Sequence, residues 1–490
     1  MAGDLLVHTE AGAVRGRRDG TVAVFRGMPY AQPPQGPLRF QAPVRVSAWD
    51  GVRDAMRFGP AAPQPGTLSD SDGDLGWLTV NVWSPDLGAV NLPVMVWIHG
   101  GRYLEDGTAN PHYDGTNLAE AGVVLVSLNY RVGMEGFASI AEAPNNRGLL
   151  DQIAALRWVQ DNIAAFGGDP DNVTVFGQSA GAGSVASLMV MPASAGLFRR
   201  AIAQSLPGTF FTERLAAAVS SEIAAIVGTK ATVAELQHCS PRSLVSASEA
   251  LLRRMPHFAD EWGPMALTPT PFSPVVDGEV LPDAPWHGLA AGVSHHIDLL
   301  VGHTRDEYSL LGPGRDVAED QLTLTEELLG PASRSPVDYR DAFPDASRAH
   351  LHETINADWL FRMPSEHLAA AHHAGGGTAW LYELAWAFNP SERASHSLDM
   401  LLVFGTLTDR EIASHPDAYR TASQEYNAIS ETMRRDWVRF ASSGTPGWTP
   451  YTPPRRCTRV YDTDTADCPY PEETSRRLWA NHRFGPLDIA

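Results

Sequence analysis

The chain has 490 residues, of which 43% are hydrophobic, so it can bury a large core without help from metals or disulfides. Its 57 acidic residues outnumber its 37 Lys and Arg residues, and the formal net charge of -20 repels phosphate backbones and anionic membranes. Nucleic acid and membrane surfaces are therefore not expected partners. Otherwise the charge is interpreted as a solubility feature without functional meaning.

Proline and glycine are scattered between apolar segments, and we find no repeat, low-complexity tract or linker, which predicts one folded domain over residues 1–490. The N-terminus, MAGDLLVHTE, lacks the basic start and apolar run of a secretory signal. No stretch of about 18 apolar residues occurs. Cys239, Cys457 and Cys468 have no metal-ligand spacing, and although Cys457 and Cys468 can pair, we expect reduced thiols and a cytoplasmic location.

Apolar runs rich in β-branched residues predict buried strands at residues 92–98, 123–128 and 173–176. Continuous apolarity without alternation indicates burial on both faces, as in a parallel sheet flanked by helices. Between the last two runs, apolar positions at helical spacing predict a helix over residues 149–166, which completes the strand-helix-strand unit of an α/β fold. Further helices are predicted near residues 213–227, 364–374 and 424–442, whereas the pattern from 230 to 350 is mixed.

The third of these strands continues directly into a G-x-S-x-G motif centred on Ser179, and the small residues that follow can start a helix. A turn this tight forces the central residue into a strained backbone conformation, and its flanking glycines let helix and strand approach. A lone match to this motif is also an ordinary Gly-Ser turn. The strand before it and the helix after it favour Ser179 as a nucleophile.

A serine nucleophile needs a base within about 2.6–3.2 Å and donors for the developing oxyanion. The sequence HGGR at residues 99–102 follows the first predicted strand, where a glycine-rich loop can expose backbone N–H groups. On its own this sequence also suits a tight turn. We expect the amides of Gly101, Arg102 and Ala180 to be the oxyanion donors.

Together these segments resemble the type-B carboxylesterase and cholinesterase-like family, to which the bacterial para-nitrobenzyl-esterase-like enzymes belong. The resemblance covers most of the chain and rests on the following stretches: FRGMPYAQPPQG (25–36) with Arg39-Phe40, NVWSP (81–85), NYR (129–131), NRGLLDQ (146–152) and FGGDP (166–170). It implies an α/β-hydrolase fold, with a large, mostly parallel central sheet flanked by helices and with helical insertions that form a substrate gorge.

The resemblance places the catalytic acid at Glu307, in VGHTRDE, and the general base at His396, in HSLDM. The order Ser, Glu, His is that of α/β-hydrolases. From the residues alone, Asp306 competes with Glu307, and 17 histidines compete for the role of base. The implied mechanism is acyl transfer to Ser179, with His396 moving the proton and Glu307 orienting the imidazole, and it needs no metal or organic cofactor.

Several residues depart from the family pattern. Two family cysteines correspond to Ala62 and Trp77, so their disulfide is absent and the loop between them is expected to be shorter. Arg102 replaces the third glycine of the oxyanion loop. Three roles are open to its side chain: it shields the oxyanion, it binds an acidic group of the substrate, or it points to solvent. Gln178 stands where cholinesterases carry glutamate, which removes one negative charge beside the nucleophile.

Ser205, in AIAQS, resembles a family position that supports the acid by hydrogen bonding, and the alternative is a buried serine satisfied by backbone. No tryptophan precedes Asp74 in the segment from Gly59, so cation–π recognition of choline is not supported. Threonines stand in the acyl-pocket segment LTPTPF (267–272) where cholinesterases have bulky rings, which predicts a wider acyl pocket. The predicted pocket residues are Tyr103, Thr268, Thr270, Phe272, Leu310 and Leu311.

The sequence thus predicts a serine carboxylesterase that acts on small to medium neutral esters. Alternatives are a dedicated natural-product tailoring esterase or transacylase of the same fold, and a non-catalytic binding protein like those relatives that have lost the triad. The expected partner is a small-molecule ester, and monomer and homodimer both stay open.

Overall fold

The computed structural model describes residues 5–66, 76–312, 316–331, 338–415 and 417–490. The strands are β1 (Leu5–Thr9), β2 (Gly12–Asp19), β3 (Val22–Pro29), β4 (Val52–Asp54), β5 (Thr79–Ser84), β6 (Leu92–Ile98), β7 (Val124–Leu128), β8 (Gly168–Gln178), β9 (Arg200–Gln204), β10 (Phe211–Thr212), β11 (Val275–Val276), β12 (Asp298–Thr304), β13 (Ala379–Leu384), β14 (Cys457–Tyr461) and β15 (Ala466–Pro469).

The α-helices are α1 (Thr116–Glu120), α2 (Gly133–Phe137), α3 (Arg147–Asn162), α4 (Ala180–Val190), α5 (Glu213–Ile226), α6 (Val233–Leu236), α7 (Pro241–Arg254), α8 (Ala259–Trp262), α9 (Pro285–Ala290), α10 (Glu319–Leu329), α11 (Tyr339–Ala342), α12 (Arg348–Ala357), α13 (Met363–Ala374), α14 (Leu398–Phe404), α15 (Asp409–Ser414), α16 (Ala422–Ser443) and α17 (Glu473–Trp479). A π-helical turn, η7 (Asp358–Arg362), joins α12 to α13.

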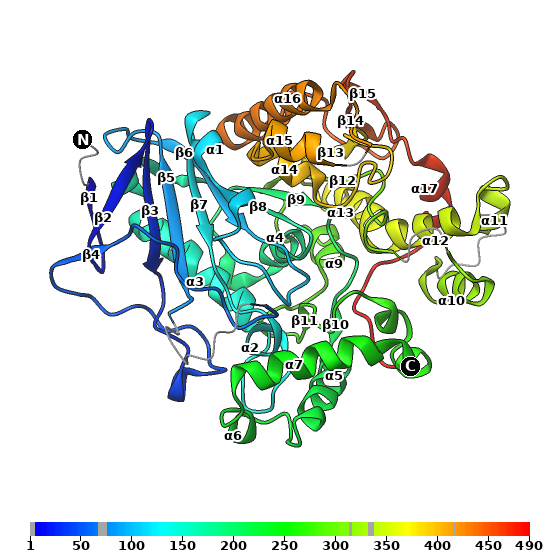
Figure 1. Cartoon of the computed structure of the whole chain (residues 1–490), viewed down its shortest axis with the longest axis horizontal. Coiled ribbons are helices and arrows are strands. Elements are labelled where there is room, and N and C mark those ends of the chain that lie inside the picture. Colours follow the sequence, from blue (N-terminus) through cyan, green and yellow to red (C-terminus); the bar gives the residue numbers. More distant parts are fainter. Residues whose placement is uncertain (1–4, 67–75, 313–315, 332–337, 416) are drawn as a thin grey trace.

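The main sheet has the strand order β1-β2-β3-β5-β7-β6-β8-β9-β12-β13-β14-β15, with β4 beside β2 (Figure 1). From β7 to β14 every neighbouring pair is parallel, and so is the β2–β4 pair, whereas the other pairs at both ends of the sheet are antiparallel. The parallel strands therefore end at one common edge, where loops after β6, β8, β12 and β13 can bring side chains together.

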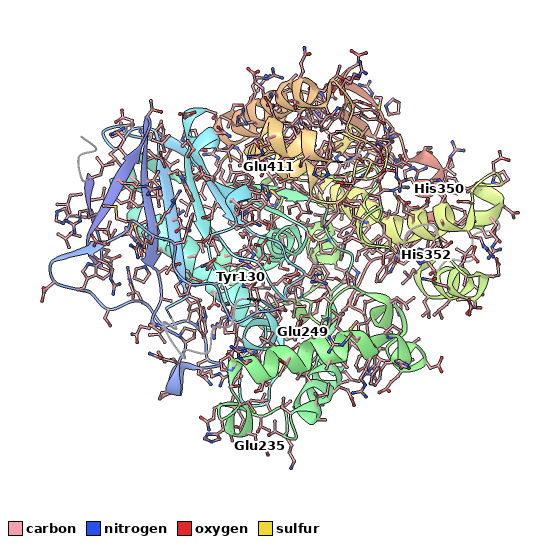
Figure 2. All side chains as sticks on the ribbon, in the orientation of Figure 1. Tyr130, Glu235, Glu249, His350, His352 and Glu411 are labelled. Atoms are coloured by element: carbon pink, nitrogen blue, oxygen red, sulfur yellow. The ribbon has the colours of Figure 1, made fainter. Side chains whose placement is uncertain are left out.

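The apolar strands are buried on both faces, as their uninterrupted hydrophobicity predicts. In β6, Val94, Val96 and Ile98 face the core layer that contains α3, α4 and α13, whereas Met95 and Trp97 face the layer that contains α14 and α16. In Figure 1 α14, α15 and α16 lie at the top of the molecule beside β13 and β14, and α5 and α7 lie at the bottom. In Figure 2 Tyr130, after β7, lies in the interior, whereas Glu235, on α6, lies at the edge of the molecule.

The predicted elements are present with small shifts at their ends. β8 begins at Gly168, five residues before the predicted run at 173, because its polar first half still pairs with β6 through Leu92 and Gly168. The predicted helix over residues 149–166 is α3, which ends at Asn162 and continues as a 3₁₀ turn to Phe166. Within the described part of the chain, no helix is long and apolar enough to cross a membrane.

Candidate active site

Ser179 lies at the sharp turn between β8 and α4. Its backbone has φ 56° and ψ -123°, a conformation that costs about 1–3 kcal/mol and is concentrated at functional sites. A Cβ on Gly177 would lie 2.6 Å from the backbone of Gly181, and one on Gly181 would lie 2.1 Å from the carbonyl oxygen of Ile98. Both positions therefore require glycine, and the turn presents Ser179 at the carboxyl edge of the sheet.

The loop that is predicted to supply the oxyanion donors follows β6. Gly101 and Arg102 have φ values of 87° and 60°, and among the described residues neither backbone N–H donates to a protein acceptor. Ala180 is the first residue of α4, so its N–H has no acceptor within the helix. All three residues line the same cavity as Ser179. Three residues whose backbone N–H groups have no acceptor among the described residues thus line the cavity that contains Ser179.

Two side chains hold this loop by hydrogen bonds to its carbonyl oxygens. Thr270 donates its hydroxyl to the carbonyl oxygen of Arg102 at 2.6 Å. The Tyr130 hydroxyl donates to the carbonyl oxygen of His99 at 2.7 Å, and the two rings stack with centroids 4.3 Å apart. The loop is therefore held at both ends.

Glu307 and His396 meet at the carboxyl ends of β12 and β13. Glu307 Oε2 lies 2.5 Å from His396 Nδ1, and Glu307 Oε1 accepts a hydrogen bond from the Thr304 amide at 2.9 Å. The Asp306 carboxylate instead pairs with Arg393, at 3.0 Å. Geometry thus distinguishes two acidic residues that are adjacent in the sequence.

Electrostatics favour an ionised Glu307. Burial alone raises the pKa of its carboxyl, but the charge and hydrogen bond of His396, the Ser205 hydroxyl and the Thr304 amide hold the pKa of Glu307 below its ordinary value. The Ser205 hydroxyl is buried close to this carboxylate, although it makes no contact with the full geometry of a hydrogen bond. Gln178, on the other side of the imidazole, is buried beside His396.

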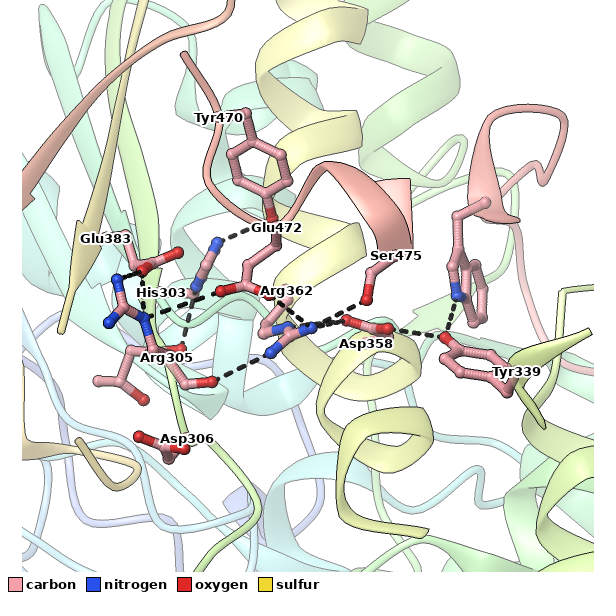
Figure 3. A network of polar contacts seen from close by, with 12 residues as sticks. His303, Arg305, Asp306, Tyr339, Asp358, Arg362, Glu383, Tyr470, Glu472 and Ser475 are labelled. Atoms are coloured by element: carbon pink, nitrogen blue, oxygen red, sulfur yellow. Dashed lines mark hydrogen bonds and ion pairs between the residues drawn. The ribbon is translucent and has the colours of Figure 1, made fainter. Parts of the chain in front are cut away.

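Phe361 is a residue of the site that no pattern in the sequence indicates. Its ring stacks on the His396 ring with centroids 4.3 Å apart, and it lies in the π-helical turn η7. The adjacent Arg362 is almost fully buried and donates to Asp358 at 2.7 Å, to the Arg305 carbonyl at 3.2 Å and to Ser475 at 3.0 Å (Figure 3). This network ties η7 to the end of β12 and to the C-terminal segment, so it fixes the position of Phe361.

A cavity of about 330 Å³ opens onto these groups. Four predicted pocket residues line it, namely Tyr103, Thr268, Thr270 and Leu311. Phe272 is buried outside the lining, and Leu310 is exposed outside it. Most of the wall surface of the cavity is apolar, and Pro207, Leu360, Phe361 and Met400 also contribute to it. In the sequence, a single apolar residue of a helix or turn looks the same whether it lines a pocket or packs in the core. The sequence therefore does not indicate Pro207, Leu360, Phe361 and Met400 as pocket residues.

The charged side chains of the cavity have partners. The Arg102 guanidinium pairs with Glu105 and donates to the Pro269 carbonyl at 3.2 Å. The Asp106 carboxylate accepts a hydrogen bond from the Tyr113 hydroxyl at 2.5 Å. Arg102 is therefore held against the acyl-pocket segment and does not extend freely into solvent.

The positions of the two missing family cysteines, Ala62 and Trp77, are both buried. Residues 67–75 between them, including Asp74, lie outside the described residues. Cys457 and Cys468 are free, and in the β14–β15 ladder they stand opposite Pro469 and Thr458, not opposite each other.

A mostly parallel sheet, a nucleophile elbow and a Glu-His pair at its carboxyl edge define a serine hydrolase of the α/β-hydrolase fold. A sequence profile of the carboxylesterase family matches residues 3–468. Para-nitrobenzyl esterase of Bacillus subtilis is 37% identical over 96% of this chain and 98% of its own. Fumonisin B1 esterase of Sphingopyxis macrogoltabida is 33% identical over 90% of this chain and 82% of its own.

Solved structures agree with these matches. The carboxylesterase of Geobacillus stearothermophilus superposes with a TM-score of 0.84 at 34% identity, covering 97% of this chain and 99% of that one. A PNB esterase structure gives a TM-score of 0.82 at 35% identity, with the same coverage. The chain belongs to the carboxylesterase family and is a carboxylic-ester hydrolase.

Proposed function

We propose that Ser179 attacks the carbonyl carbon of a neutral carboxylic ester and forms an acyl-enzyme. His396 takes the serine proton and delivers it to the departing alcohol, while Glu307 orients the imidazole and stabilises its cation. Water then attacks the acyl-enzyme with the same base. The observation that carries this proposal is the 2.5 Å contact of Glu307 with His396 in a cavity that also contains Ser179 and three free amides.

The amides of Gly101, Arg102 and Ala180 are suited to bind the oxygen of the tetrahedral intermediate. Each such donor contributes about 3–4 kcal/mol to the transition state. Among the described residues no hydrogen bond joins Ser179 Oγ to His396. Such bonds often tighten only when substrate is bound, so this geometry is compatible with the proposed base.

The test is Ser179→Ala, measured on a p-nitrophenyl ester and with a fluorophosphonate that labels the nucleophile. Turnover should fall by about 10⁴-fold or more and labelling should vanish, while the thermal midpoint stays close to that of the wild type. Substantial turnover in a folded Ser179→Ala protein would refute the assignment.

The substrate class is inferred from the cavity wall. Its charged groups are paired and most of its wall surface is apolar, which favours neutral esters. Thr268 and Thr270 leave more room than aromatic rings would. We therefore expect similar kcat/KM values for p-nitrophenyl esters from acetate to octanoate, and a strict preference for acetate would contradict the wide pocket.

We also propose a reducing cellular compartment, the cytoplasm, because Cys239, Cys457 and Cys468 are all unpaired. Thiol titration of unfolded protein purified without reductant should find three free thiols. A disulfide in protein isolated from its native compartment would overturn this proposal.

A further inference from the structure

The base and the acid of the site come from two different loops. Glu307 lies in the turn after β12, whereas His396 lies beyond β13, after residues 385–395, which form neither a helix nor a strand. Arg393 and Ser397 on either side of it have φ values of 57° and 73°, in the left-handed region that disfavours non-glycine residues. The segment that carries the imidazole is therefore strained, and contacts from outside must hold it.

Those contacts come from the turn that carries the acid. The Asp306 amide donates to the Ala394 carbonyl at 3.0 Å, and the Ala394 amide donates to Asp306 Oδ2 at 3.2 Å. The other carboxylate oxygen of Asp306 lies 3.0 Å from Arg393 Nη1. The Ser309 hydroxyl donates to the Glu392 carbonyl at 2.8 Å. Asp306, which directly precedes the acid Glu307, thus contacts Ala394 and Arg393, which lie two and three residues before the base His396.

The Arg393 guanidinium also pairs with Glu353 on α12. The side chains of Asp306, Arg393 and Glu353 are 20%, 34% and 19% exposed, so water reaches the cluster only in part. One arginine between two carboxylates restrains the segment from two elements at once. Partly exposed ion pairs contribute little to global stability, so the main effect of this one is expected to be local.

We propose that Asp306 and Arg393 are positioning residues for the catalytic histidine. The pair fastens the strained segment 393–397 to the turn that carries Glu307, and so maintains the 2.5 Å contact between Glu307 Oε2 and His396 Nδ1. The proposal rests on the function proposed above for Glu307 and His396. It assigns a role to the acidic residue that sequence alone leaves in competition with Glu307.

Two substitutions test the pair without removing bulk. Asp306→Asn keeps an acceptor for the Ala394 amide and loses the charge, and Arg393→Gln loses the charge from the other side. Each should lower kcat by about 10–100-fold with KM nearly unchanged, since a misplaced catalytic group slows the chemical step more than it weakens binding. The double variant should be no slower than the worse single variant, and Arg393→Lys should recover most of the rate.

Two further readouts separate positioning from a general loss of structure. The downfield ¹H NMR signal of the His396 Nδ1 proton should weaken or shift in Asp306→Asn and Arg393→Gln, while the thermal midpoint changes little. Arg340→Gln is the matched control. The side chain of Arg340, on α11, is 42% exposed and pairs in the same way with two carboxylates, those of Glu319 and Glu326 on α10, away from His396. Arg340→Gln should leave kcat and the NMR signal unchanged.

The outcomes are distinct. Unchanged kcat in folded Arg393→Gln, or an equal loss in Arg340→Gln, would overturn the positioning role. If Arg393→Gln does not fold, Asp306→Asn and Arg393→Lys provide the same comparison. Ser179→Ala is measured in parallel: its inactivity beside a fully active Arg393→Gln refutes only the positioning role, whereas an active Ser179→Ala refutes the proposed function itself.

Discussion

The side-chain amide nitrogen of Gln178 lies 3.0 Å from Nε2 of His396. Because Nδ1 of this ring donates to the Glu307 carboxylate, Nε2 carries the lone pair and accepts a hydrogen bond from the amide. The atom that takes the serine proton in the proposed mechanism is thus occupied by a neutral donor in the free enzyme. A glutamate at this position would present an oxygen and a negative charge instead.

Gln178→Glu should therefore change the pH dependence. A carboxylate about 3 Å from the imidazole stabilises its protonated, inactive form, so the acidic limb of kcat/KM should move to higher pH by about one unit or more. The measurement is a pH–rate profile with a neutral p-nitrophenyl ester. Gln178→Met, which has similar length and no charge, should move the limb much less, and equal shifts in both variants would contradict the electrostatic cause.

Phe361 should matter through its ring. Stacked aromatic pairs contribute about 0.5–1.5 kcal/mol beyond burial, so loss of the ring in Phe361→Leu should lower kcat by about 2–10-fold as the imidazole loses its support. Phe361→Tyr keeps the stack on His396 and should stay close to the wild type. Steady-state kinetics on both variants tests this, and equal kcat values in Phe361→Leu and the wild type would show that stacking is irrelevant to turnover.

Local motifs explain why much of this site could be predicted. The strand, the elbow at Ser179 and the glycine-rich loop at Gly101 are each set by neighbours within a few residues, and the structure has them where the pattern indicates. The parallel strands were predictable for the same reason, because burial on both faces leaves an uninterrupted apolar run. The role of Ser179 itself stays a prediction until it is tested.

Long-range partners could not be predicted in this way. Asp306 and Glu307 are neighbours of the same charge, and only the path of residues 385–395 decides which one meets His396. The Arg102 side chain is held by Pro269, 167 residues away, and no local pattern encodes that contact. Phe361 lies in a π-helical turn, and an apolar residue in such a segment is normally interpreted as core.

The buried ion pair between Arg131 and Asp151 should be costly to break from one side. Both side chains are fully buried, and three hydrogen bonds from the Arg131 amide and guanidinium reach the Asp151 carboxylate at 2.7–3.0 Å. Asp151→Asn would leave an uncompensated guanidinium and should cost about 3–5 kcal/mol in the free energy of unfolding.

Urea denaturation followed by tryptophan fluorescence would measure that loss. Arg214→Gln, which breaks the exposed pair with Asp488, is the control and should cost at most about 1 kcal/mol. Similar losses of unfolding free energy in Asp151→Asn and Arg214→Gln would show that burial does not increase the cost of breaking an ion pair.

His303 should make the protein sensitive to acid. Burial and the positive charge of Arg362 lower the pKa of His303 from 6.5 to about 4, and its Nε2 lies 2.9 Å from the Tyr470 hydroxyl (Figure 3). Between these two values the unfolded chain binds a proton at this position and the folded chain does not. The stability contributed by the neutral imidazole is therefore complete above pH 6.5 and is lost as the pH falls towards 4, by up to about 3 kcal/mol.

His303→Gln removes this titration, so its unfolding free energy should fall less steeply than that of the wild type over the same range. His8→Gln, at an exposed position of β1, should keep the wild-type slope, and identical slopes for His303→Gln and the wild type would rule out this source of acid sensitivity.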